Sequence, residues 1–221
     1  MKTFRKLLVA VTACVAFAGF ACAADQEAPD ALVKRVSQEV LDTAKADSEV
    51  QGGNQKRVLD LVEAKILPYI DFQRMTALAA GRYWRDATPE QQKQLTDEFR
   101  TLLVFTYSGA IAQVKDQRMQ FKPIRGALTD NEVEVHSEVT QLRGEPIQLN
   151  YRLEKLPAGW KIYDVNILGA WLVETYKGNF ATEIGKGGID GLIKALTDKN
   201  KKLAAAAMRP PKMTKSTNNA T

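Results

Sequence analysis

The spacing of apolar residues changes twice along this 221-residue chain, and no other feature constrains the fold as much. Up to Asp116 apolar side chains recur every three to four residues, which is typical of amphipathic helices. Over residues 117–168 apolar and polar side chains alternate, as in strands that bury one face. After Gly169 the helical spacing returns. This order of helices, strands and helices predicts an α+β fold.

The first helical part is expected over about residues 29–115. The Gly-Gly-Asn segment at 52–54 interrupts the apolar stripe, and its asparagine is suited to cap the next helix. The Thr-Pro-Glu-Gln segment at 88–91 predicts a capping box with proline in the first turn. The helix that follows is expected to run to about Gln113 with one strongly apolar face.

Four strands are expected over about residues 117–168. They cover residues 119–124, 132–139, 147–154 and 160–167. Short turns between them imply an antiparallel meander, whose apolar face needs a cover of helices. The C-terminal helices are expected over about 169–202, with a break at the Gly-Lys-Gly-Gly segment 185–188. Residues 24–198 are therefore expected to form a single α+β domain, with an apolar pocket between its layers.

The N-terminus has the pattern of an export signal. Basic residues precede an apolar run over 7–20, and Ala-Cys-Ala at 21–23 supplies the small residues that signal peptidase accepts. The run is shorter than the roughly 20 residues of a transmembrane helix. We therefore expect residues 1–23 to be a removable signal peptide. The alternatives are a short membrane anchor and a lipoprotein start at Cys22, although Gly19 stands where that start needs a Leu-like residue.

Removal of this segment changes the composition of what folds. Both cysteines, Cys14 and Cys22, would be lost, so a thiol nucleophile, a zinc–thiolate site and a disulfide are excluded. The net charge of +5 for the whole chain does not describe the expected domain, because residues 24–198 hold 22 basic and 26 acidic residues, a net of −4. No basic face suited to nucleic acid is present. Residues 203–221 are rich in Ala, Lys, Pro, Thr and Asn and are expected to be a disordered tail.

Catalytic motifs are scarce in the expected domain. His136 is the only histidine and shares the polar side of its strand with Glu134 and Glu138, which favours a surface position over a metal ligand or general base. The chain has neither a Gly-x-Ser-x-Gly turn nor a phosphate-binding Gly-x-x-x-x-Gly-Lys loop.

Two aspartates lie among bulky apolar neighbours, Asp71 and Asp164. A buried carboxylate needs a basic or N–H partner, so we interpret both as structural charges that tie the sheet to the helices. The alternative is an isomerase or hydrolase that uses one of them in an apolar pocket. A non-enzymatic adaptor or chaperone with an exposed apolar face is a third possibility.

Several motifs, in order along the chain, resemble those of one family. They are Pro-Tyr-Ile-Asp-Phe at 68–72, Gly-Arg-Tyr-Trp-Arg-Asp-Ala-Thr at 81–88, Glu-Gln at 90–91, Phe99 with Leu102, Leu103 and Tyr107, Tyr-Asp-Val at 163–165, Gly169, Leu172 with Val173, and Thr175 with Tyr176. Over about residues 30–196 the chain resembles the MlaC family, the periplasmic phospholipid-binding proteins also called toluene-tolerance proteins. It departs from the family pattern at Ala170, Trp171 and Lys177, and the bulky Trp171 could alter the pocket wall.

The resemblance implies a sheet domain like nuclear transport factor two, elaborated by helices. It also implies a monomeric periplasmic carrier that holds phospholipid as cargo, binds no cofactor and catalyses no reaction. Such a carrier shuttles lipid between an outer-membrane lipoprotein–porin complex and an inner-membrane ABC transporter complex, and so maintains outer-membrane lipid asymmetry. Because no arginine cluster suited to phosphate is apparent, we expect apolar contacts without strong head-group recognition.

Face periodicity selects the residues expected to line the lipid pocket, which come from the long helix, the strands and the start of the last helix. They are Leu103, Tyr107, Ile111, Val133, Val135, Val139, Leu149, Tyr151, Leu153, Val165, Ile167 and Trp171.

Overall fold

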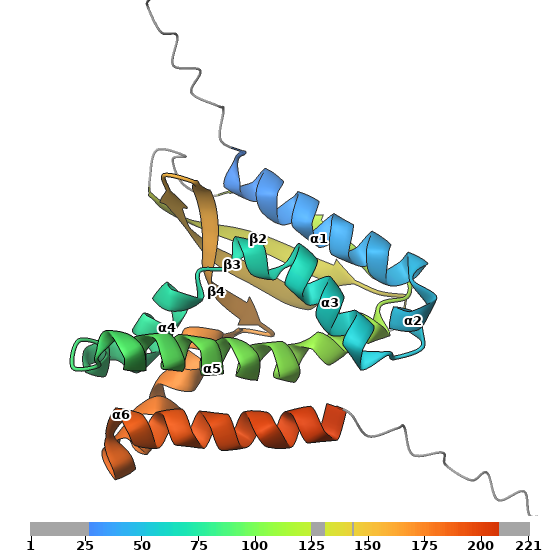
Figure 1. Cartoon of the computed structure of the whole chain (residues 1–221). Helices are drawn as coiled ribbons and strands as arrows, with labels where there is room; N and C mark the ends of the chain where they lie inside the picture. Colours follow the sequence, from blue (N-terminus) through green and yellow to red (C-terminus); the bar gives the residue numbers. More distant parts are fainter. Residues whose placement is uncertain (1–26, 125–130, 143, 208–221) are drawn as a thin grey trace, which may run out of the picture.

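The computed structural model describes residues 27–124, 131–142 and 144–207 (Figure 1). The expected signal peptide at 1–23 lies outside these residues, as does the tail beyond 207. Among the described residues, no helix is long and apolar enough to cross a membrane.

The first part of the chain is helical, as predicted. It contains α1 (Pro29–Ala46), α2 (Ser48–Gln51), α3 (Gln55–Lys65), the 3-10 turn η1 (Leu67–Tyr69), α4 (Phe72–Ala80), the 3-10 turn η2 (Gly81–Trp84), α5 (Pro89–Tyr107) and the 3-10 turn η3 (Ser108–Gln113). Asn54 caps α3 by accepting the backbone N–H of Arg57. The capping box of α5 is confirmed, because the Thr88 hydroxyl accepts the Gln91 N–H while the Gln91 side chain accepts the Thr88 N–H.

The sheet has five strands, one more than predicted, and every neighbouring pair is antiparallel. The strands are β1 (Arg118–Phe121), β2 (Glu132–Thr140), β3 (Ile147–Leu156), β4 (Gly159–Ile167) and β5 (Ala170–Trp171), and they pair in chain order. The placement of Ala170 and Trp171 in a helix was wrong. Leu168 and Gly169 both have positive φ, at 54° and 88°, so the chain reverses tightly and β5 pairs with the end of β4.

The last helix, α6 (Leu172–Ala207), kinks at Gly187 and Gly188, inside the segment where a break was predicted. It continues to Ala207, so the expectation of a disordered tail from residue 203 was wrong for its first residues. Alanine is the strongest helix former, and Leu203 packs against the core, so the helix persists through this stretch.

The core consists of three clusters. The helical cluster joins α4, α5 and α6 around Phe99, Leu102 and Phe180. The sheet cluster packs α1 against the apolar face of β2, β3 and β4 and includes Val135 and Leu153. The N-terminal cluster joins α1, α2 and α3 near η3, which contributes the half-buried Ile111. Ile70 and Val165 pack against both the helical and the sheet clusters, so they mark the junction between the two halves of the molecule.

Candidate functional site

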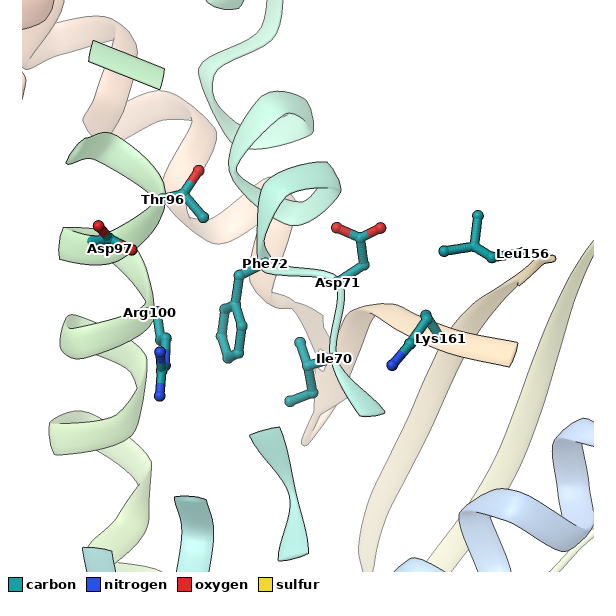
Figure 2. A pocket seen from close by; sticks show the side chains of 8 residues that line it. All are labelled: Ile70, Asp71, Phe72, Thr96, Asp97, Arg100, Leu156 and Lys161. Carbon is teal, nitrogen blue, oxygen red and sulfur yellow. The ribbon is translucent and has the colours of Figure 1, made fainter. Parts of the chain in front are cut away.

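Two adjoining hollows run along α5 and share Asp97 and Arg100, so we treat them as one groove, the α5 groove. The first, of about 270 Å³, lies between α5, the start of α4 and the β3–β4 hairpin (Figure 2). The second, of about 390 Å³, lies between α5, α3 and η1. Each is near the lower end of the roughly 300–1,000 Å³ found for small-molecule pockets.

Large apolar side chains form half of the groove lining. They are Leu59, Leu67, Ile70, Phe72, Val104, Phe105 and Leu156, and all are half-buried. Such walls can shelter a hydrocarbon chain, because each CH₂ removed from water contributes roughly 0.8 kcal/mol. Ile70 also belongs to the junction between the helical and sheet clusters, so the groove is continuous with this junction.

Five charged side chains also line the groove. Arg100 and Lys161 are the cations among the lining residues, and Asp71, Asp97 and Glu63 are the carboxylates. In Figure 2, Arg100 on α5 and Lys161 on β4 stand on opposite sides of Phe72 and Ile70.

The predicted lining residues are distributed among the core clusters. Val133, Val135, Leu149, Tyr151, Leu153 and Val165 belong to or pack on the sheet cluster. Leu103, Tyr107 and Ile167 join the helical cluster, as Val165 also does, and Ile111 packs on the N-terminal cluster. Val139 and Trp171 are assigned to none of the three clusters, and Arg152 covers the Trp171 ring at 3.8 Å on the polar face of the sheet.

None of these predicted residues lines the α5 groove. Val135 and Leu153 are fully buried, so the structure holds this part of the sheet cluster closed. The lining assignment therefore stays a prediction, and it requires the two halves to separate at the junction. Periodicity missed the groove residues, although Leu59 gave a signal by standing beside the buried stripe of Val58, Leu61 and Val62 on α3.

Both aspartates hold backbone groups in place. The Asp164 carboxylate is buried, and it accepts the N–H groups of Val165 and of Val173 at 2.9 and 3.1 Å. Burial raises the pKa of Asp164, while these bonds and nearby Arg152 oppose that rise. Asp71 caps α4 through the Arg74 N–H, and its own N–H donates to Ile162 of β4. These contacts tie helices to the sheet, as predicted.

His136 lies beside Glu134 on the polar face, with its Nε2 3.7 Å from the carboxylate. Among the described residues, no group of three or more His, Cys, Asp or Glu side chains could hold a metal ion.

Comparison with known proteins decides the family. The family model described as MlaC protein matches residues 34–198. The chain belongs to the MlaC family. Among curated members, it is 24% identical to the toluene tolerance protein ttg2D of Pseudomonas putida over 74% of this chain and 76% of that protein. It is 22% identical to the intermembrane phospholipid transport system binding protein MlaC of Haemophilus influenzae, over 76% of this chain and 80% of that protein.

A solved structure resembles the chain more strongly. It is a phospholipid-binding protein from Ralstonia solanacearum in complex with a phospholipid. The two share 49% identity with a TM-score of 0.76, over 79% of this chain and 98% of that one. The chain therefore shares its α+β architecture with this phospholipid-binding protein.

Proposed function

We propose that this MlaC-family chain is a periplasmic carrier that encloses the acyl chains of a phospholipid. The observation that carries the proposal is the Ralstonia solanacearum relative, which is 49% identical over nearly its whole length and holds a phospholipid. The apolar α5 groove and the junction beneath it give this chain surfaces of suitable chemistry.

Energetics favour an enclosed cargo. Exposing two acyl chains of ordinary length to water costs on the order of 20 kcal/mol, at roughly 0.8 kcal/mol for each CH₂. The apolar side chains that line the groove are only half-buried, so the groove can recover only part of that cost. The rest requires the chains to enter between the sheet and helical clusters, to which most of the predicted lining residues belong.

In the proposed function, phospholipid is the cargo, no cofactor is bound, and the protein catalyses no reaction on the lipid. Asp164 and Asp71 support this view, because each carboxylate is already occupied by backbone N–H groups. The carrier would exchange lipid with an outer-membrane lipoprotein–porin complex and an inner-membrane ABC transporter complex. The export-signal pattern of residues 1–23 supports a periplasmic location, and we propose that the carrier is a monomer.

Lipid analysis of the purified protein tests the proposal. The full chain is expressed with its own N-terminal segment, recovered from the periplasm, and examined by native mass spectrometry and by organic extraction. We expect phospholipid in stoichiometric amounts, because the chains leave the pocket slowly without a membrane partner. An unrelated periplasmic protein purified in parallel sets the background. Protein that folds but carries no phospholipid above this background would contradict the proposal.

A further inference from the structure

We propose that the α5 groove holds the phosphate of its lipid between Arg100 and Lys161. The inference rests on the proposed function and goes beyond it, because it adds head-group recognition to a pocket expected to use apolar contacts alone. Arg100 lines both hollows of the groove, and Lys161 lines the first from the opposite wall (Figure 2).

Among the residues that the structure describes, Arg100 has only a weak partner. Its guanidinium lies 3.5 Å from the Glu63 carboxylate, and the two side chains are 41% and 73% exposed. An exposed ion pair of this kind contributes little, so a phosphate can replace the glutamate at small cost. A guanidinium also matches a phosphate geometrically, because two of its N–H groups can bond two oxygens at once.

Two of the three carboxylates of the groove have partners other than Arg100 and Lys161. Asp97 pairs with Lys93 at 2.6 Å, one helical turn away on α5. Asp71 is engaged as the cap of α4, where it accepts the Arg74 N–H at 2.8 Å. These partners engage Asp97 and Asp71, and the third carboxylate, Glu63, is the weakly held partner of Arg100 itself. The groove therefore offers an incoming phosphate two cations whose bonding capacity is only partly used.

Lys161 supplies the second positive charge. Its ammonium donates one hydrogen bond to the Pro68 carbonyl, which fixes the side chain against η1 and leaves two further N–H donors. The apolar side chains of Ile70 and Phe72 lie between the two cations. If the phosphate lies between Arg100 and Lys161, the acyl chains of the same lipid can continue along Ile70 toward the junction of the helical and sheet clusters.

Arg100→Gln tests this arrangement with two cargoes that share acyl chains, phosphatidylglycerol and diacylglycerol. Each is loaded onto the full chain, and its release to phosphatidylcholine vesicles is timed. We expect Arg100→Gln to release phosphatidylglycerol about tenfold faster, the scale of one charge-assisted hydrogen bond. Release of diacylglycerol should not change, because it has no phosphate. Lys161→Gln should act in the same direction, and Arg118→Gln, at an exposed position of strand β1, is the matched control.

Salt and inorganic phosphate give further readouts. Salt should speed phosphatidylglycerol release from the unmodified protein more than from Arg100→Gln, because it screens the attraction at Arg100. Equal effects of Arg100→Gln on both cargoes, or none on either, would overturn the inference. It would also be overturned if Arg100→Gln abolished binding of inorganic phosphate to the lipid-free protein while phosphatidylglycerol release stayed unchanged. Failure of the unmodified protein to hold either cargo would instead remove the proposed function itself.

Discussion

At the scale of single residues, Arg74 joins α4 to the sheet. Its guanidinium stacks 3.9 Å from the Tyr163 ring and pairs with Glu132 at 2.6 Å and with Glu154. The Tyr163 hydroxyl donates to Glu132 as well. Burial raises the pKa of Tyr163 to about 12, whereas the hydrogen bond from Arg74 lowers the pKa of Glu132. One arginine thus holds three side chains of the sheet.

Arg74→Met should lower the free energy of unfolding by about 2 kcal/mol near neutral pH, through lost charged hydrogen bonds and ring stacking. The folded state lowers the pKa of Glu132, so this stabilisation is complete above the pKa of the unfolded chain. It is lost as pH falls through the folded value. The free energies of unfolding of the unmodified protein and of Arg74→Met should therefore approach each other below about pH 4. Urea unfolding at several pH values measures it, with Arg118→Met as control. If the difference in free energy of unfolding stays constant down to pH 2, the ionised Glu132 carboxylate does not contribute to the stabilisation by Arg74.

At the scale of elements, α6 depends on its kink. Phe180 before the kink packs edge-on against Phe99 of α5, with ring centroids 5.0 Å apart. After the kink, the Asn200 amide donates to the Glu98 carbonyl, and the helix runs alongside α5 (Figure 1). Gly188 makes the turn possible with φ 66° and ψ −165°, a conformation almost restricted to glycine. The two halves of α6 can therefore both pack on one helix.

Gly188→Ala should destabilise the protein by about 1–3 kcal/mol, because alanine is strained in that conformation. The matched control is Gly178→Ala in the same helix, where an added Cβ meets nothing within 4 Å. That change should stabilise by up to about 1 kcal/mol, because alanine favours helix. Thermal unfolding of both variants measures the difference. Destabilisation of equal size in both would mean that the kink has no special role.

At the scale of the whole molecule, the junction of the sheet and helical clusters decides whether a lipid can be enclosed. Val165 packs on both clusters, and the groove reaches the junction through Ile70. The structure brings most of the predicted lining residues to one side of this junction or the other. Opening at the junction would turn packed core into pocket wall, which links the lining prediction to a movement of the two halves.

Tyr107→Trp and Val139→Trp test where the acyl chains lie. Tyr107 packs on the helical cluster, whereas Val139 lies near the β1 edge of the sheet, opposite Met119 and Ile147. Both variants should fold and co-purify with less phospholipid, because a larger ring obstructs the pocket. Circular dichroism checks the fold, and lipid extraction gives the content. A loss with Tyr107→Trp alone would confine the pocket to the junction. If both variants retain normal amounts of lipid, the lining assignment is wrong.

Most of the fold could be predicted from the sequence, because its signals are local. The capping box at Thr88 and the asparagine cap at residue 54 act within one turn of helix. The alternation of apolar and polar residues in β2 and β3 indicates which face of each strand is buried, and this does not depend on which element covers that face. The site was harder to predict. Arg100, Lys161 and Ile70 come from three separate segments, and no spacing along the chain relates them.

The sequence by itself determined the α+β class, the absence of cysteine after residue 23 and the family motifs. Short-range hydrogen bonds and side-chain periodicity suffice for these, since both are properties of neighbouring residues. The tertiary structure alone decided that Ala170 and Trp171 form a strand, that Asp164 ties β4 to the start of α6, and that two cations share one groove. Each of these depends on segments far apart in sequence meeting in space, and packing of the whole chain sets where they meet.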